Sequence, residues 1–356
     1  MLSRMLAILA CFTGATPAIA LVPPLPPGDP LAQSISAAPL DSESAAVIGW
    51  LASQGWGLGR MQIDFSIEVN EAPPGTPTIV STERPGYYLP DCERSVLVPT
   101  PSGGAIEGVS GYQCSGGDCH LIVFDTGTRV LYEAWLADIS GGVLRSQCLV
   151  KWELDKVYPP ERRGWGCTSA DAAGLPIAPL LFDADEVASG AINHAIRFIL
   201  PNARIRTGYY VSPATHVGSP SGPPSAPPYG ARLRLRADYP LTMLPNDAAR
   251  TVARAMQRYG IVLADGGNVA LTARSDRFTA AKWSGLLGPR DLDRLQVSDF
   301  QMVEAGERHI ASYDCERAPP PLAPPSPTSQ QVPFGRVPLA VLAALLALAA
   351  ARSRID

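Results

Sequence analysis

Residues 120–135, HLIVFDTGTRVLYEAW, decide the fold that this sequence predicts. Two apolar runs rich in aromatic and β-branched residues, 120–125 and 129–135, lie on either side of the segment Thr126-Gly127-Thr128. Strand-forming runs joined by a short segment that contains glycine are typical of a β-hairpin. The stretch therefore predicts two strands with Gly127 in the turn between them.

Strand patterns dominate on both sides of this hairpin. Residues 232–239 alternate between polar and apolar side chains, which places Arg232, Arg234 and Arg236 on one face of a strand. That ladder is either a solvated sheet face or a surface for an anionic ligand. Further strands are predicted at residues 191–200, 261–265 and 269–272, the last two around a turn at residues 266–268.

Helix patterns are few and short. Residues 183–190 combine a capping box with a final glycine, and residues 246–260 show apolar side chains at helical spacing before a glycine. A third short helix is predicted at residues 289–295. We therefore expect a mostly β fold of the α+β class, an antiparallel β-sandwich or jelly-roll-like domain with a few short packing helices.

Both ends of the chain carry segments typical of export. Residues 1–20 combine Arg4, an apolar run and the small-residue site Ala18-Ile19-Ala20, which is the layout of a cleavable signal peptide. Residues 337–351 are apolar throughout and precede two arginines, but as a helix they are shorter than a hydrocarbon core of about 30 Å. This tail resembles the carboxyl-terminal sorting tails of bacterial surface proteins. It either stays as a membrane anchor or is removed during sorting.

The region between these ends predicts one globular domain. Residues 21–40 form a proline-rich lead-in with little to bury, and residues 41–315 form a single mostly β domain. Residues 316–336 are a proline-rich linker before the hydrophobic tail at residues 337–356. We expect the protein at the cell surface, associated with the outer membrane, or secreted after the tail is processed.

Six cysteines follow the predicted signal peptide, namely Cys92, Cys114, Cys119, Cys148, Cys167 and Cys315. An even number suits an oxidising compartment and predicts three disulfides. Closeness in sequence favours pairing Cys114 with Cys119 and Cys148 with Cys167, which leaves Cys92 for Cys315, although sequence alone does not fix the connectivity. No pair of C-x-x-C motifs occurs, so we predict no metal site, and the sequence identifies no cofactor.

Charge and motifs exclude several classes of function. The formal net charge of −4 shows no basic footprint, so we expect no nucleic-acid partner. The chain contains no G-x-S-x-G elbow, no H-E-x-x-H pair and no glycine-rich phosphate loop. The common serine hydrolase, zinc protease and nucleotide-binding patterns are therefore not indicated.

Several segments resemble a family of exported bacterial proteins to which we can attach no established reaction. The segments are residues 118–125 (DCHLIVFD), 131–133 (LYE), 168–176 (TSADAAGLP), 193–198 (NHAIRF), 213–216 (PATH), 232–237 (RLRLRA) and 258–265 (RYGIVLAD). They span most of the chain between residues 41 and 304. The resemblance implies export and brings no catalytic residue with it.

The chain has four histidines, and each suggests a different role. His120 follows Asp118 in a D-x-H pattern, which either orients an imidazole for acid-base chemistry, holds a metal or reflects an ordinary turn. His216 lies in a long loop at residues 213–230, downstream of Tyr210, where the two side chains could abstract a proton beside a carboxylate. We expect His194 to pack against the core with one ring nitrogen bonded to the backbone, and His309 to face solvent.

Arg197 and several acids complete the candidate site. Arg197 either grips the carboxylate of a uronic-acid polymer or forms an ordinary ion pair with an aspartate. Asp171 is either a buried acid or the cap of a short turn, and Asp265 ends a strand as either a site residue or a hairpin residue. Glu133 is a further carboxylate of interest.

These residues support two hypotheses of different classes. The first is an exported enzyme that acts on a polysaccharide by hydrolysis or β-elimination. Its candidate catalytic residues are His216, Arg197, Tyr210, His120, Asp171 and Asp265. The second is a non-catalytic surface or carbohydrate-binding protein. Convergence of these side chains in one cleft favours the enzyme, and scattered side chains favour the binding protein.

Overall fold

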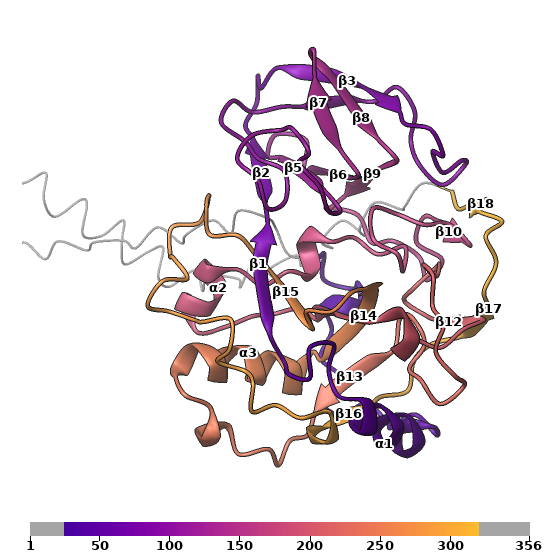
Figure 1. Cartoon of the computed structure of the whole chain (residues 1–356), viewed down its shortest axis with the longest axis vertical. Coiled ribbons are helices and arrows are strands. Elements are labelled where there is room, and N and C mark those ends of the chain that lie inside the picture. The colour runs from indigo at the N-terminus through magenta and orange to yellow at the C-terminus, as the bar shows by residue number, and fades with distance from the viewer. Residues whose placement is uncertain (1–24, 320–356) are drawn as a thin grey trace, which may run out of the picture. The chain divides into compact units, whose positions relative to one another are not determined.

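The computed structural model describes residues 25–319 (Figure 1). Strands make up 28% of the structure and helices 15%, which confirms the predicted mostly β fold of the α+β class. The predicted signal peptide, most of the proline-rich linker and the hydrophobic tail lie outside the described residues. No helix within residues 25–319 is both long enough and apolar enough to cross a bilayer.

The predicted hairpin forms the middle of a four-stranded sheet, which we call the hairpin sheet. Strands β5 (Leu121–Asp125) and β6 (Val130–Trp135) pair antiparallel, which confirms the prediction. β2 (Val69–Ala72) and β9 (Cys148–Glu153) complete the order β2-β5-β6-β9. The Asp125 carboxylate accepts hydrogen bonds from the backbone N–H groups of Gly127 and Thr128 and so fixes the turn.

A second four-stranded sheet packs against the hairpin sheet. Its strands, in spatial order, are β4 (Leu97–Pro99), β3 (Thr78–Glu83), β8 (Val143–Ser146) and β7 (Asp138–Ser140). Val98, Val123 and Leu144 belong to one hydrophobic cluster, so the two sheets share a core. The opposite face of the hairpin sheet packs on residues 170–181 through side chains such as Phe124 and Trp152.

The largest sheet has six strands and is mixed. In spatial order its strands are β1 (Ile63–Ile67), β15 (Leu271–Arg274), β11 (Ile196–Leu200), β14 (Ile261–Gly266), β13 (Arg232–Leu235) and β16 (Phe300–Met302). β11 runs parallel to β14, whereas β13 is antiparallel to both β14 and β16. Only Glu68 separates β1 from β2, so the chain passes directly from this sheet into the hairpin sheet (Figure 1).

The turn at residues 266–268 does not join neighbouring strands. β11 lies between β14 and β15, because the backbone N–H of Gly267 donates to Leu200 O and that of Ile199 donates to Ala270 O. The turn therefore passes around the end of β11. Ile196, Phe198 and Leu200 are buried, which explains why this strand occupies the middle of the sheet.

Within residues 25–319, three α-helices accompany the sheets, α1 (Ser44–Gln54), α2 (Ala184–Ser189) and α3 (Asp247–Arg258). The capping box of α2 and the left-handed Gly190 that ends it confirm the predicted helix. α3 begins after an Asn246 cap, as predicted, and contacts β13 (Figure 1). Five 3-10 helices lie at Pro30–Ala32, Ala178–Leu180, Asn202–Arg204, Leu241–Met243 and Val297–Asp299.

The helix predicted at residues 289–295 is wrong. These residues form successive turns, in which the Asp291 carboxylate accepts hydrogen bonds from the Gly288 backbone and the Asn246 side chain. The backbone bonds of this segment each reach back three residues, as from Asp293 N to Arg290 O and from Leu295 N to Leu292 O, so no regular α-helical ladder forms.

Residues 25–40, expected to bury little, are attached to the six-stranded sheet. Leu31 and Ile35 are buried. Arg232 donates to the carbonyls of Pro30 and Gln33, and Arg234 donates to those of residues 35, 36 and 38. Two members of the arginine ladder therefore hold the amino-terminal segment, and their guanidinium groups are occupied by backbone carbonyls.

The carboxyl-terminal part of the described chain forms two small antiparallel sheets. β17 (Arg308–Ile310) pairs with β12 (Tyr209–Val211), and β18 (Glu316–Arg317) pairs with β10 (Gly164–Trp165). These pairings place residues 308–317 beside residues 164–165 and 209–211, which lie near the middle of the sequence. We call residues 308–317 the carboxyl strap.

The three predicted disulfides form, but two of the favoured pairings are wrong. Cys114 bonds to Cys119 as predicted, whereas Cys92 bonds to Cys148 and Cys167 bonds to Cys315. The β6–β9 register places Cys148 opposite Trp135, and the backbone N–H of Glu93 donates to Leu149 O beside it. Strand register therefore brings Cys92 to Cys148, and the carboxyl strap brings Cys315 to Cys167.

Candidate functional site

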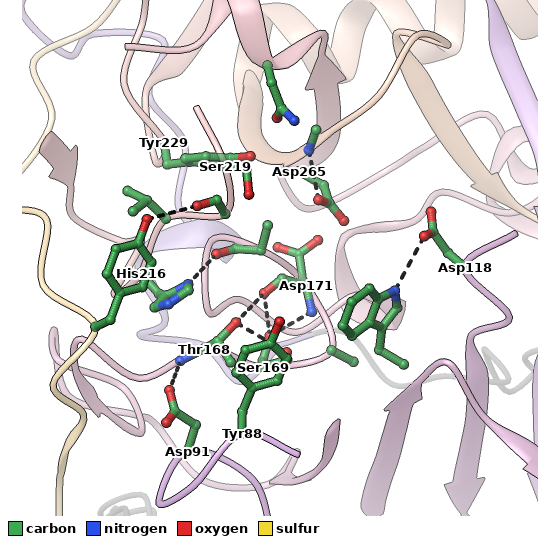
Figure 2. Close-up of a pocket in the computed structure, with 18 of the residues that line it drawn as sticks. Tyr88, Asp91, Asp118, Thr168, Ser169, Asp171, His216, Ser219, Tyr229 and Asp265 are labelled. Atoms are coloured by element: carbon green, nitrogen blue, oxygen red, sulfur yellow. Dashed lines mark hydrogen bonds between the residues drawn. The ribbon is translucent and has the colours of Figure 1, made fainter. Parts of the chain in front are cut away.

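A cavity of about 700 Å³ opens where the hairpin sheet meets the end of β14 and the loop after β10 (Figure 2). Its wall includes residues 168–172 and 216–219, Asp265, Trp135, Tyr313 and side chains from residues 87–91. Four of the segments quoted for the resemblance line the cavity, namely residues 118–125, 168–176, 213–216 and 258–265. Two more, residues 131–133 and 193–198, supply Glu133 and Arg197 behind it. Distant parts of the sequence therefore converge on one site.

Arg197 holds two carboxylates at the inner end of this cavity. Its Nη2 atom lies 2.5 Å from Asp171 Oδ1 and 3.2 Å from Asp265 Oδ2, and its Nη1 atom donates to Thr272 Oγ1 at 2.8 Å. Arg197 and Asp171 are fully buried, whereas the Asp265 side chain is 25% exposed. The parallel neighbours β11 and β14 bring Arg197 to Asp265, and Figure 2 shows the two carboxyl groups pointing toward one another.

One cation therefore faces two acids in a poorly solvated position. Burial raises the pKa of Asp171 to about 8 and raises the pKa of Asp265, although Arg197 favours the ionised form of both. The pair consequently retains a proton near neutral pH. Asp171 Oδ2 is buried and has no hydrogen-bond partner among residues 25–319, so it is the oxygen free to hold that proton.

His120 lies behind Asp171 and is paired with an acid that the sequence did not indicate. Its Nδ1 atom is 2.6 Å from Glu107 Oε2, and its Nε2 atom is 3.1 Å from Ala170 O. Burial lowers the pKa of His120, but Glu107 outweighs this effect and the pKa rises to about 9. The imidazolium then donates from both nitrogens, one to Glu107 and one to the loop that carries Asp171.

The predicted pairing of Asp118 with His120 does not form. Cys119 between them has a φ of 48°, and the Asp118 carboxylate instead accepts a hydrogen bond from Trp135 Nε1 at 3.4 Å. The turn interpretation of this D-x-H pattern therefore holds. Asp118 is nevertheless part of the cavity wall.

Glu133 fixes the far end of the same loop. Its carboxylate accepts hydrogen bonds from the backbone N–H groups of Ile177 and Ala178 and from Trp152 Nε1. Burial raises the pKa of Glu133 to about 7. Together, His120 on the β5 side and Glu133 on β6 attach residues 170–178 to the hairpin sheet.

His216 lines the cavity as a neutral imidazole. Burial lowers its pKa, and its Nδ1 atom is 2.9 Å from Ala172 O. A neutral ring that donates from Nδ1 keeps Nε2 as an acceptor. The His216 ring meets the Tyr313 ring edge to face at 5.4 Å.

Aromatic side chains surround the cavity entrance. Tyr313 is 68% exposed and Tyr88 is 41% exposed, and the Tyr88 and Trp135 rings are 6.2 Å apart. Tyr229 lies deeper, with a buried hydroxyl that has no partner within the described chain. In Figure 2, Tyr229 and Tyr88 lie on opposite sides of the two carboxyl groups.

Three of the side chains weighed in the sequence lie away from the cavity. Tyr210 does not line it but is buried in a stack with His309, whose ring also lies 3.8 Å from Trp165. The expectation that His309 faces solvent is therefore wrong. His194 behaves as expected, because it is buried with Nδ1 2.8 Å from Ala195 O.

The sequence therefore identified Asp171, Asp265 and His216, which line the cavity, and Arg197 and His120, which lie behind it, but missed other parts of the site. The side chains that it missed are Glu107, Trp135, Tyr229, Tyr313 and Tyr88. Trp135 ends the predicted hairpin, and Tyr229 ends the long loop, so both positions were visible as element ends. Nothing in the sequence indicated that Glu107 or Tyr313 would reach this site.

Within residues 25–319, no group of three or more His, Cys, Asp or Glu side chains is arranged to hold a metal ion. No family model, curated protein or solved structure matches the chain. The function must therefore be argued from the geometry of the cavity.

Proposed function

We propose that this protein is an exported hydrolase of glycosidic bonds, with Asp171 as the general acid and Asp265 as the second catalytic carboxylate. One observation carries the proposal. Asp171 and Asp265 contact the same Arg197 nitrogen, and Asp171 has a buried oxygen without a partner at the cavity. Glycosidases need two carboxyl groups of unequal proton affinity at the scissile bond.

The spacing of the acids favours a double displacement. Because both contact Arg197 Nη2, the two bonded oxygens lie within about 6 Å of each other, as in enzymes that retain configuration. Asp265 would attack the anomeric carbon while Asp171 Oδ2 gives its proton to the departing oxygen. Asp171 would then take a proton from the water that releases the sugar from Asp265.

The shape and lining of the cavity also suit a saccharide. A volume of about 700 Å³ is ample for one or more sugar rings, and aromatic rims are suited to the apolar faces of such rings. Elimination receives less support than hydrolysis, because Tyr210 lies away from His216 in a stack with His309 and Arg197 is already occupied by Asp171 and Asp265.

Carbohydrate binding without catalysis is the second candidate. It is favoured by the complete burial of Asp171, whose ion pair with Arg197 is also a plausible structural contact. Both candidates predict glycan binding, and only the first predicts turnover.

The test is a screen of the purified protein for new reducing ends from neutral and charged glycans. Asp171→Asn and Asp265→Asn should each lower the rate by at least about 100-fold, whereas Asp238→Asn, at a carboxylate that is 78% exposed, should not. Wild-type activity should fall as pH rises above about 8, where Asp171 loses its proton. Glycan binding without turnover would leave only the binding function.

Export and retention belong to the same proposal. Three disulfides fit an oxidising environment, and the predicted signal peptide and tail supply a route and an anchor. Replacing Leu345 and Leu346 by aspartates should release the protein into the medium. Unchanged retention would refute the anchor.

A further inference from the structure

The cavity is lined by acids and by no basic side chain other than a neutral histidine. Its acidic lining residues are Asp91, Asp118, Asp171 and Asp265, and neither lysine nor arginine belongs to the wall. The Asp91 carboxylate is partly satisfied, because it accepts a hydrogen bond from the Thr168 backbone at 2.8 Å. Asp118 is exposed and forms no ion pair within residues 25–319.

The nearby arginines are not available to an anionic substrate. Arg197 is buried and occupied by two aspartates and Thr272. Arg163 is buried and donates to the carbonyls of Asp91 and Thr168 and to the Glu93 carboxylate. A uronic-acid chain would therefore meet carboxylates in the cavity without a guanidinium to bind it.

One corner of the cavity wall has the features of a site for a cationic group. Trp135 donates from Nε1 to the Asp118 carboxylate at 3.4 Å, and the Tyr88 ring is tilted against the Trp135 ring at 6.2 Å. An exposed carboxylate beside two aromatic rings attracts an ammonium group by charge and by cation–π interaction. We call Tyr88, Asp118 and Trp135 the aromatic corner.

Two unpartnered polar groups deeper in the cavity independently indicate a ligand. Asp171 Oδ2 and the Tyr229 hydroxyl are both buried, and neither has a hydrogen-bond partner in the described chain. Both residues line the cavity. A buried polar group without a partner is unfavourable, so a polar ligand that bonds to these atoms would stabilise the site.

We propose that the substrate is a glycan whose sugars carry free amino groups, with an ammonium group at the aromatic corner and ring hydroxyls toward Tyr229 and Asp171. This inference rests on the proposed glycan function and adds the charge of the substrate. Because an exposed carboxylate and a cation–π contact are each weak in water, we expect a preference of roughly tenfold for the amino sugar, which is about 1.4 kcal/mol.

The test uses matched oligosaccharides that differ only in one ring substituent. The probes are glucosamine oligomers, their N-acetylated counterparts, glucose oligomers of the same linkage, and a uronate oligomer, each titrated against the full protein by calorimetry. We expect the amino form to bind roughly tenfold more tightly than the N-acetylated and neutral forms, and the uronate to bind most weakly. Raising the salt concentration should weaken binding of the amino form alone.

Variants of the aromatic corner separate charge recognition from glycan binding. Asp118→Asn should remove most of the preference for the amino form and leave binding of the neutral oligomer unchanged. Asp125→Asn, in the turn of the same hairpin, is the matched control and should retain the preference. Equal binding of all forms, or an unaltered preference in Asp118→Asn, would overturn the inference while leaving the hydrolase proposal intact. Absence of binding and turnover with every glycan would overturn both.

Discussion

Asp171, the proposed general acid, also links the stability of the fold to pH. Its carboxyl group has an ordinary pKa of 3.8, and burial in the fold raises that pKa to about 8. Between these values the folded protein holds a proton that the unfolded chain has lost. The stabilisation is fully present below pH 3.8 and is lost as the pH rises through about 8.

We therefore expect Asp171→Asn to be more stable than the wild type at pH 8, although it is inactive. The amide keeps an oxygen for Arg197 but has no proton to lose, and Asp265 still balances the guanidinium. The gain should be at least about 1 kcal/mol, since one pKa unit corresponds to about 1.36 kcal/mol. Urea unfolding at pH 4 and pH 8 measures this, and the advantage should shrink at pH 4. A variant that is no more stable than the wild type at pH 8 would contradict the raised pKa.

For single residues, the chemical role of a side chain could be predicted from the sequence more readily than the residue that it contacts. The sequence predicted Asp171 and Arg197 as candidate catalytic residues. An ion pair with an aspartate was one of the two interpretations of Arg197. The partner of His120 was not recognised, because Glu107 is separated from it by the disulfide loop of Cys114 and Cys119. Contacts of this kind depend on the path of a loop, and the sequence of a loop has no periodic pattern from which that path could be predicted.

At the element scale, the loop at residues 168–178 depends on the hairpin sheet for its position. His120 donates to Ala170 O on one side of Asp171, and Glu133 accepts from the backbone of Ile177 and Ala178 on the other. The loop has no regular structure of its own before residue 178. Loss of either contact should therefore displace Asp171.

We expect Glu107→Gln to destabilise the protein by about 2–4 kcal/mol at pH 6, because the amide can still accept a hydrogen bond but leaves the buried imidazolium of His120 without a negative charge beside it. In the wild type, the pKa of His120 is raised from 6.5 to about 9. The stabilisation from this pair is thus full below pH 6.5 and is lost as the pH rises through about 9. The destabilisation should accordingly be smaller at pH 10 than at pH 6. An NMR titration should show the His120 pKa falling in the variant, and an unchanged value would exclude the pair as its cause.

The carboxyl strap contributes Tyr313 to the cavity entrance. The Tyr313 hydroxyl donates to Gly218 O at 3.1 Å, while its ring is largely exposed beside His216. Tyr313→Ala should weaken glycan binding by about 1 kcal/mol and change the free energy of unfolding by less than about 0.5 kcal/mol. Ile310→Ala is the matched control, because Ile310 is 76% exposed on the same strap and does not line the cavity. Equal effects of the two variants would show that Tyr313 is not part of the binding surface.

Local elements were predicted well, and their spatial order was not. The hairpin and helices α2 and α3 have their signals within a few residues, namely a glycine turn, a capping box and a terminal glycine. The insertion of β11 between β14 and β15 depends instead on backbone hydrogen bonds between strands that are far apart in the sequence, and these leave no local signal. α1 has its apolar residues spread around the helix, so periodicity gave no signal for it.

At the scale of the whole molecule, the cavity exists because two sheets and the strap meet. Asp265 and Arg197 come from the six-stranded sheet, and Trp135 comes from the hairpin sheet. Asp118 lies in the loop before β5, and Tyr313 lies on the strap. The sequence analysis predicted the role of each residue from its neighbours in the sequence alone. Their convergence could not be read from the sequence, because it depends on the packing of the sheets on residues 170–181.

The disulfides test this assembly as a whole. Cys167 and Cys315 are 148 residues apart and tie the strap to the loop before Asp171, whereas Cys114 and Cys119 are only 5 residues apart. In the chain-entropy account, closing a longer loop removes more conformations from the unfolded state. Replacing Cys167 and Cys315 by alanines should therefore lower the free energy of unfolding by about 5 kcal/mol, and replacing Cys114 and Cys119 by about 2 kcal/mol.

Urea unfolding of the two variants compares their free energies of unfolding, and mass spectrometry of unreduced peptides identifies which cysteines are paired. A peptide that links Cys92 to Cys315 would contradict the fold, since Cys92 then could not reach Cys148 beside the hairpin sheet and the strap could not bring Tyr313 to the cavity.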